Sequence, residues 1–234
     1  MTTTMPRTPI AILLGAEAPR VLTTPMLAAI LADRRKLRAR NTLFRWVRDQ
    51  VDSGVLRPMT RGLYLNQLAA PRPLAAEAAG FIRTGAIVSL QTVLGEAGIT
   101  NNFPDLVTSV IPHERGRVPS VRPVRAADIE FRFHAMPARL LNEQAGELED
   151  RLDVDVKYPR ATREKALMDW IYLGASRYSK IAGPPLDLEI ERLDTSRLRR
   201  LARSMNLVEE LKVWQVRKRK YDADPDVKAN SSAE

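Results

Sequence analysis

The chain has 234 residues, of which 44% are hydrophobic, enough for one large domain or two small ones with buried cores. It contains no cysteine, which excludes disulfide bonds, thiolate nucleophiles and cysteine zinc sites. Lysine and arginine number 37 against 28 aspartate and glutamate, a formal charge of +9 that favours polyanionic partners.

The positive charge is concentrated near the N-terminus. Residues 1–68 contain 11 basic and 4 acidic residues, net +7, which leaves 26 against 24, net +2, for the rest of the chain. A boundary with two prolines and several small residues lies at 69–75. We therefore expect two domains, residues 1–68 and 76–221, followed by a disordered tail at 222–234.

The N-terminal segment has a short apolar stretch, Ile10 to Ala16, far below the roughly 20 residues that cross a bilayer. It imitates a small signal peptide. However, Thr8 as N-cap, Pro9 at the first helical position and Gly15 as the stop favour a short helix. We expect no membrane segment and a cytoplasmic location.

Two further helices are predicted before a hairpin. Thr24 as N-cap and Pro25 begin a short apolar helix that runs to about Ala32. A third helix is predicted over roughly 39–53 and ends at Gly54. Its apolar stripe, which we expect to face the core, consists of Leu43, Phe44, Val47 and Val51.

The opposite face of this third helix is polar and ordered by charge. Its N-terminal half carries amide, hydroxyl and guanidinium groups, and Asp49 and Asp52 follow. A helix that enters the major groove of DNA by its N-terminal half has this order, because acidic groups near phosphates repel. An ordinary amphipathic surface helix is the alternative.

Two strands, Val55 to Thr60 and Leu63 to Leu65, are predicted to form a β-hairpin across Arg61 and Gly62. Three helices followed by a hairpin, with a basic third helix, is the order of a winged helix-turn-helix DNA-binding domain. The hairpin arginines would reach phosphates or the minor groove. The candidate DNA-binding residues are Arg34, Arg35, Lys36, Arg38, Arg40, Asn41, Thr42, Arg45, Arg48, Arg57 and Arg61.

The remainder of the chain has a mixed α/β pattern. The fold class is therefore α+β, an N-terminal winged helix-turn-helix followed by a mixed α/β C-terminal domain. Helices are predicted over 74–84, 90–97, 163–173 and from Thr195 toward Lys220, and strands over 86–89, 106–111, 129–134 and 152–157.

Motifs for catalysis are scarce. The two histidines, His113 and His134, have no partner at metal-ligand spacing, and no phosphate loop, dinucleotide fingerprint or nucleophile elbow occurs. We expect neither an enzyme nor a bound cofactor or metal. One alternative stays open, a Mg²⁺-dependent nuclease in which Asp105 and Asp155 hold the ion and Lys157 lies near the attacking water.

Several separate stretches have a combined pattern typical of one family. They are Leu22-Thr23-Thr24, Val51 to Leu56, Arg61-Gly62-Leu63-Tyr64, Ala86 to Ser89 with Leu94, and Arg160-Ala161-Thr162-Arg163-Glu164-Lys165-Ala166-Leu167-Met168-Asp169. Over about residues 20–175 the chain resembles the AbiE-type (abortive infection) antitoxin regulators.

This resemblance implies two activities. In that family an N-terminal winged helix binds repeats in its own promoter and represses the operon. The C-terminal domain counters a nucleotidyltransferase toxin from the same operon, which makes a type IV toxin-antitoxin system. The implied partners are double-stranded operator DNA and such a toxin, and a stand-alone repressor without a toxin is the alternative. The antitoxin role falls on Arg160, Thr162, Glu164, Lys165 and Asp169.

These five residues also have a purely structural interpretation. Arg160 and Thr162 would cap the start of the predicted helix, and Glu164, Lys165 and Asp169 would form ion pairs on its surface. On either interpretation we expect Lys165 and Asp169 to be exposed, so that replacing them leaves folding nearly intact.

Overall fold

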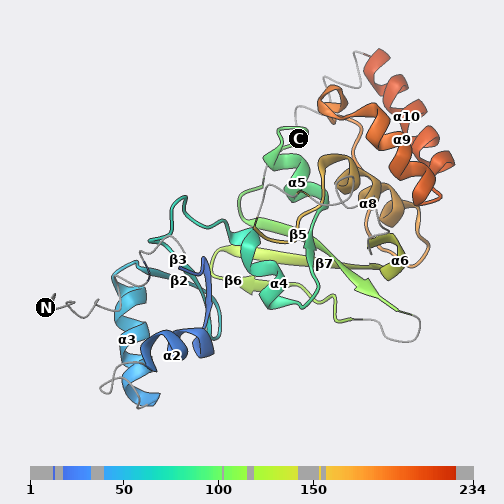
Figure 1. The fold of residues 1–234 in the computed structure, drawn as a ribbon. Coiled ribbons are helices and arrows are strands. Elements are labelled where there is room, and N and C mark those ends of the chain that lie inside the picture. Colours follow the sequence, from blue (N-terminus) through green and yellow to red (C-terminus); the bar gives the residue numbers. More distant parts are fainter. Residues whose placement is uncertain are drawn as a thin grey trace, which may run out of the picture. The chain divides into compact units, whose positions relative to one another are not determined.

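The computed structural model in Figure 1 describes residues 13, 18–32, 40–101, 103–114, 119–141, 153 and 157–224. Within these ranges the chain forms eight α-helices and two β-sheets, so the α+β character predicted from the sequence is confirmed. No helix in the described part is both long and apolar enough to cross a membrane.

The chain divides into two compact units. Unit 1 comprises Met1–Ile82 with Arg125–Ile129, and unit 2 comprises Arg83–Val124 with Glu130–Glu234. The division after Ile82 lies later than the boundary at 69–75 that the sequence predicts.

Between residues 18 and 66, the described part of unit 1 forms two helices and a three-stranded antiparallel sheet of order β1-β3-β2 (Figure 1). The hairpin and both helices are close to their predicted positions, whereas a strand as short as β1 has too few residues to show alternation in the sequence. The elements are β1 (Val21–Thr23), α2 (Thr24–Ala32), α3 (Arg40–Asp52), β2 (Leu56–Thr60) and β3 (Leu63–Asn66).

The core of unit 1 lies between these helices and the sheet. Leu22, Leu27 and Leu56 are almost fully inaccessible and pack with Leu43 and Val47 of α3. Of the predicted N-terminal helix at 8–15, only residue 13 is described, and this leucine is buried in the same core.

The start of α2 lies against the hairpin turn. The hydroxyl of Thr23 accepts a hydrogen bond from the Met26 N–H at 3.3 Å, so Thr23 caps the helix. The sequence predicts Thr24 as the N-cap, and this prediction is wrong. The Thr24 N–H instead donates to the Gly62 carbonyl at 2.9 Å. Gly62 has φ +79°, and a Cβ there would lie 2.9 Å from the Thr24 hydroxyl oxygen. The turn therefore requires glycine for both its backbone conformation and its space.

Replacing Gly62 with alanine is expected to destabilise unit 1 more than the matched change Gly54→Ala. Both glycines have positive φ, but a Cβ at Gly54 meets no atom within 4 Å. Gly54→Ala should cost about 1 to 2 kcal/mol from backbone strain alone, and Gly62→Ala should cost more because Thr24 must also move. Hydrogen exchange of the β3 amides measures the difference, and equal protection in the two variants would contradict it.

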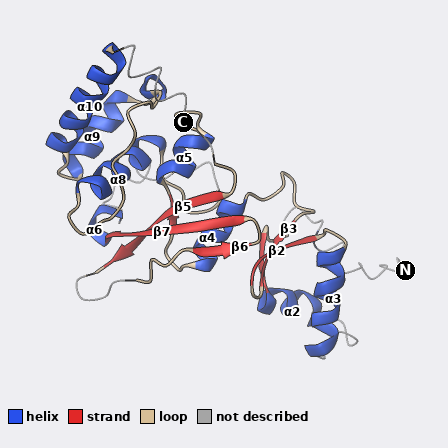
Figure 2. Cartoon of the chain, turned by 180° about the vertical axis from the view of Figure 1, so that it is seen from behind, coloured by secondary structure: helices blue, strands red, loops and turns tan. Residues whose placement is uncertain are grey.

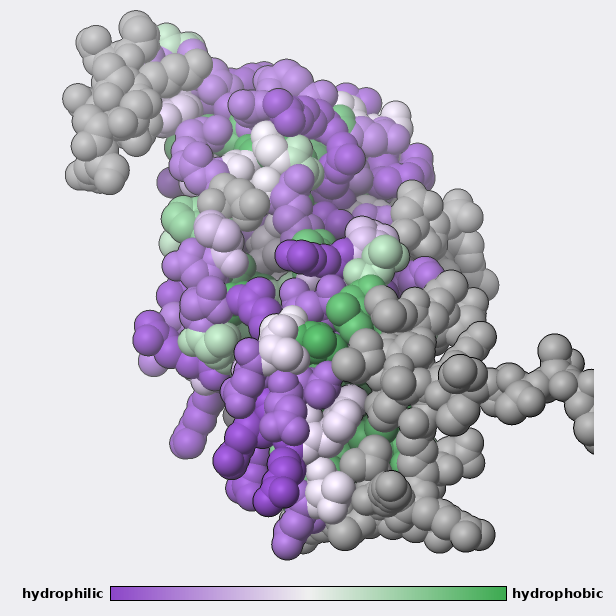
Figure 3. Space-filling model, turned by 90° about the vertical axis from the view of Figure 1, so that its left-hand side faces the viewer, coloured by the Kyte–Doolittle hydropathy of each residue, from purple (hydrophilic) through white to green (hydrophobic). Residues whose placement is uncertain are grey.

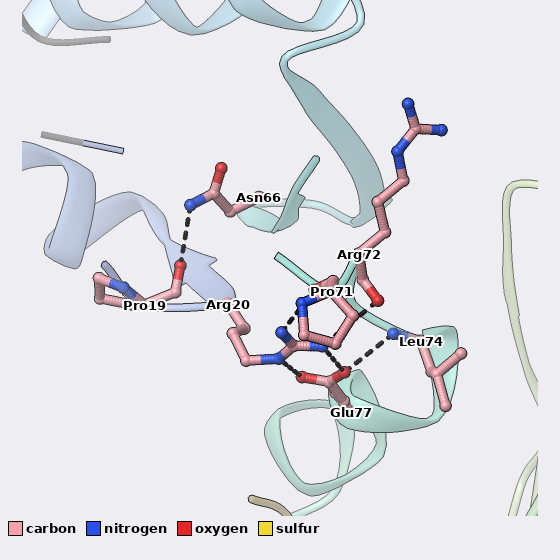
Figure 4. A network of polar contacts seen from close by, with 7 residues as sticks. All are labelled: Pro19, Arg20, Asn66, Pro71, Arg72, Leu74 and Glu77. Atoms are coloured by element: carbon pink, nitrogen blue, oxygen red, sulfur yellow. Dashed lines mark hydrogen bonds and ion pairs between the residues drawn. The ribbon is translucent and has the colours of Figure 1, made fainter. Parts of the chain in front are cut away.

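A network of polar contacts joins the segment after β3 to Arg20, which directly precedes β1 (Figure 4). Arg20 donates from Nε and Nη2 to the two carboxylate oxygens of Glu77, both at 2.8 Å, and from Nη1 to the Pro71 carbonyl at 2.6 Å. Glu77 also accepts from the Leu74 N–H at 2.9 Å. This two-pronged ion pair explains why residues beyond 68 belong to unit 1.

The helix predicted over 74–84 forms as two short pieces. A 3₁₀ turn, η2 (Ala75–Ala78), leads directly into α4 (Ala79–Ile82). The Glu77 carboxylate that bonds the Leu74 N–H fixes the first turn of this segment.

The second sheet of the described residues has four strands in the order β4-β5-β7-β6 (Figure 2). The β4 strand is antiparallel to β5, and β5 is parallel to β7 from Leu106 opposite Glu130 to His113 opposite Pro137. Helix α8 contacts α5, α9 and α10. The elements are β4 (Ile87–Val88), α5 (Leu90–Glu96), β5 (Leu106–His113), β6 (Val124–Ala126), β7 (Ile129–Pro137), α6 (Ala138–Leu141), α8 (Arg163–Ala175), η3 (Ile190–Arg192), α9 (Thr195–Ser204) and α10 (Val208–Ala223).

The C-terminal helix predicted from Thr195 toward Lys220 is two helices. Asn206 has φ +57°, and the Leu207 N–H donates to the Ala202 carbonyl at 2.8 Å, which closes α9 before α10 begins. The apolar spacing continues through this break, which is why the sequence predicts one helix. Helix α10 includes residues 222 and 223, so the predicted tail at 222–234 begins too early, and residues 225–234 lie outside the description.

The strand predicted at 152–157 falls largely outside the described residues. Asp153 and Lys157 are described, and neither lies in a strand. Asp155, one of the two metal ligands in the nuclease hypothesis, is not among the described positions.

Candidate functional site

Helix α3 presents a polar face to solvent. Leu43, Val47 and Gln50 are buried, while Asn41, Arg45 and the acidic residues at the helix end are exposed. The predicted apolar stripe is correct for Leu43 and Val47 but wrong for Phe44, which is 44% exposed. The buried side chains of α3 follow one another at spacings of four and three residues, from Leu43 to Val47 to Gln50. Gln50 is buried despite its polar side chain because its position on the helix faces the core of unit 1.

The arginines on this face are available for a ligand. Arg45 and Arg48 are exposed, and within the described part of the chain neither guanidinium forms an ion pair. Arg61 is exposed in the β2–β3 turn. In the space-filling view, most of the visible surface of the described residues is hydrophilic (Figure 3).

Arg57, also predicted to bind DNA, already has a partner. Its Nη2 donates to the Asp128 carboxylate at 2.7 Å, within unit 1. A backbone hydrogen bond and the Arg57 guanidinium hold the pKa of Asp128 below its usual range, so the pair is charged at neutral pH. A phosphate would have to compete with this carboxylate. Thr42 is half-buried, and the other predicted residues, Arg34, Arg35, Lys36, Arg38 and the side chain of Arg40, lie outside the description.

The predicted antitoxin residues gather at the start of α8. Thr162 caps this helix, because its hydroxyl accepts a hydrogen bond from the Lys165 N–H at 3.3 Å. Arg160 lies just before it and pairs with Glu96 at 2.9 Å and with Asp153 at 3.7 Å. The capping role that the sequence predicts for Thr162 is confirmed.

Lys165 and Asp169 form a buried ion pair, one turn apart on α8. Their side chains are only 2% and 1% exposed. The Ser89 hydroxyl, at the end of β4, donates to the second carboxylate oxygen of Asp169 at 2.7 Å. The predicted surface location of Lys165 and Asp169 is therefore wrong. Helix α8 packs against α5, α9 and α10, so its polar positions are enclosed as well as its apolar ones.

Glu164 connects α8 to α9. Its carboxylate accepts a hydrogen bond from the Asp194 N–H at 2.8 Å and lies 3.5 Å from the Arg197 guanidinium. The side chain of Glu164 is 6% exposed, so its predicted surface location is also wrong. We call Ser89, Glu164, Lys165 and Asp169 the α8 polar cluster, and its contacts join β4, α8 and α9.

Asp194 caps α9 with its charged carboxylate. The Ser196 and Arg197 N–H groups donate to it at 2.8 and 3.0 Å, and these bonds hold the pKa of Asp194 below its usual range. Because the folded pKa is depressed, this stabilisation is present above the unfolded value and is lost as the pH falls through the folded one.

Replacing Asp194 with alanine should therefore lower the melting temperature more at neutral pH than in acid, below the pKa of the folded carboxyl. Asp194→Asn is the matched control, since an amide oxygen caps the helix at every pH. Melting temperatures of the three proteins measured across the acidic range test this. A deficit of the alanine variant that stays constant into acid would contradict the assigned role.

Two further titratable groups in unit 2 are perturbed by burial. Burial raises the pKa of Glu96, although the neighbouring Arg160 guanidinium opposes this effect. Burial and the nearby Arg132 lower the pKa of His134, which is therefore neutral at pH 7. Among the described residues no group of three or more acidic or histidine side chains is placed to hold a metal ion.

Comparison with known proteins gives no assignment: no family model matches the chain, and no curated protein has significant similarity to it. The geometry does add one residue that sequence reasoning missed. Ser89 was part of a motif stretch but not of the predicted site, and it contacts Asp169 directly. The sequence signal for this contact is that Ala86 to Ser89 and Arg160 to Asp169 occur together in one combined pattern.

Proposed function

We propose that the chain is a DNA-binding transcriptional autorepressor and the antitoxin of a type IV toxin-antitoxin system, which counters a nucleotidyltransferase toxin. The observation that carries the proposal is the exposed polar face of α3, with Asn41, Arg45 and Arg48 before the acidic residues. In this proposal unit 1 is a winged helix-turn-helix, α3 is its recognition helix and the β2–β3 hairpin is its wing.

The arrangement of unit 1 supports this DNA-binding role. A helix inserted in the major groove must have one face packed on its own domain and the other exposed, as α3 has. Arginine binds guanine edges in two-pronged fashion, and asparagine binds adenine in the same way. The exposed Arg61 in the hairpin turn is suited to a phosphate, which positions the domain without reading sequence.

The antitoxin role rests on the resemblance carried by residues 160–169. Because the α8 polar cluster is buried, we propose that it acts by holding β4, α8 and α9 in place and not by touching the toxin. Toxin recognition then falls to exposed residues of unit 2.

A reporter assay tests the repressor role. The full chain should lower transcription from the DNA upstream of its own gene, and Arg45→Ala should relieve this repression. Expression of the chain without any change in transcription from that promoter would contradict autoregulation.

A growth-rescue assay tests the antitoxin role separately. The chain should protect cells that express a nucleotidyltransferase encoded beside its gene, and Arg45→Ala should protect equally well because α3 belongs to unit 1. Repression without protection would favour the stand-alone repressor.

A further inference from the structure

Phe44 is an aromatic side chain on the face of α3 that carries the exposed polar residues. It is 44% exposed, although phenylalanine normally contributes to a core. It lies three residues after Asn41, directly before Arg45 and four residues before Arg48, all of which are exposed. These spacings place Asn41, Arg45 and Arg48 on one side of the helix, opposite the buried Leu43, and Phe44 at the edge of that side, next to Arg48.

The neighbours of Phe44 are the residue types that read base edges. Arginine and asparagine bind the polar groups of guanine and adenine in the major groove. The only apolar group that a base presents there is the C5-methyl of thymine, and apolar side chains such as phenylalanine contact it. A partly exposed ring beside such neighbours is therefore complementary to a site that contains thymine.

We propose that Phe44 is a specificity-determining residue whose ring contacts the C5-methyl group of a thymine in the operator. This inference rests on the DNA-binding function proposed above and names the base that one position of α3 reads. Burying one methyl group against the ring should strengthen binding about fourfold relative to the same base without it. Uracil provides that comparison, because it differs from thymine only by this methyl group and pairs identically.

The experiment uses the full chain and duplex DNA enriched from a random-sequence library. Each thymine of the enriched duplex is replaced in turn by deoxyuridine, and the dissociation constant is measured by fluorescence anisotropy for the wild type and for Phe44→Ala. Phe81→Ala is the matched control, because Phe81 is also an exposed phenylalanine of unit 1, at 52%, but lies on α4. Thermal melts verify that each variant is folded, and Phe44→Leu repeats the test with a smaller apolar group.

Wild type and Phe81→Ala should lose about fourfold in affinity at one thymine position when its methyl group is removed. Phe44→Ala should lose none at that position while still discriminating its duplex from random DNA. No sensitivity to uracil in the wild type, or the same sensitivity in Phe44→Ala, would overturn the thymine contact while leaving DNA binding intact. Failure of the library to yield any preferred duplex would instead overturn the DNA-binding function itself.

Discussion

Replacing Asp169 with alanine is expected to lower the free energy of unfolding by about 3 to 5 kcal/mol, because Lys165 then keeps a buried charge without its carboxylate partner. The two side chains are only 2% and 1% exposed, so water cannot replace the lost carboxylate without opening the helix packing. The Ser89 hydroxyl also loses its acceptor at 2.7 Å. Urea unfolding followed by circular dichroism measures the change.

Two controls separate charge burial from a general effect of substitution. The double variant Lys165→Met, Asp169→Leu removes both charges and should be more stable than Asp169→Ala. The exposed pair of Lys212 and Glu209, with side chains 62% and 78% exposed, is the matched surface case, and Lys212→Ala should cost no more than about 1 kcal/mol. If Asp169→Ala changed the free energy of unfolding as little as Lys212→Ala, this result would contradict the burial of the Lys165–Asp169 ion pair.

Replacing Arg45 with alanine should weaken binding to the preferred duplex by about five- to 150-fold, equivalent to about 1 to 3 kcal/mol for one base contact. The side chain is exposed on the N-terminal half of α3, the part that would enter the groove. The loss should be confined to preferred sequences, so that discrimination disappears at one operator position. Affinities for single-base variants of the duplex, at fixed salt, measure this effect.

Arg61→Ala gives the contrasting result. If Arg61 contacts a phosphate, its removal should weaken all sequences similarly and reduce the slope of log affinity against log salt by about 0.9. Lys212→Ala, which removes the same charge from an exposed position of α10, should leave the salt slope unchanged. An Arg45→Ala protein with wild-type discrimination would show that α3 does not read the operator.

Local signals in the sequence predict much of unit 1. The basic periodic segment, with glycines at the two positions that have positive φ, correctly predicts α3 and the hairpin. Strand β1 is not predicted, because its three residues form a strand only when β3 lies beside them. The exposure of Phe44 is missed for a related reason: periodicity places it near the apolar stripe, but packing decides which residue of that edge is buried.

The stretch of residues 160–169 shows a different limit of sequence reasoning. Opposite charges one turn apart, as at Lys165 and Asp169, give the same pattern whether the pair is exposed or buried. Burial is decided by α5, α9 and α10, which contact α8 from distant parts of the chain. The parallel pairing of β5 and β7 likewise has no local signal, since it depends on register between separate strands.

We propose that the exposed face of α3 makes unit 1 a sequence-specific DNA-binding domain. The most direct measurement is competition at physiological salt, in which the full chain is bound to the DNA upstream of its own gene and challenged with random duplex. We expect the affinity for the upstream DNA to be at least about a thousandfold higher than for random duplex. Equal affinity for the two DNAs would contradict it.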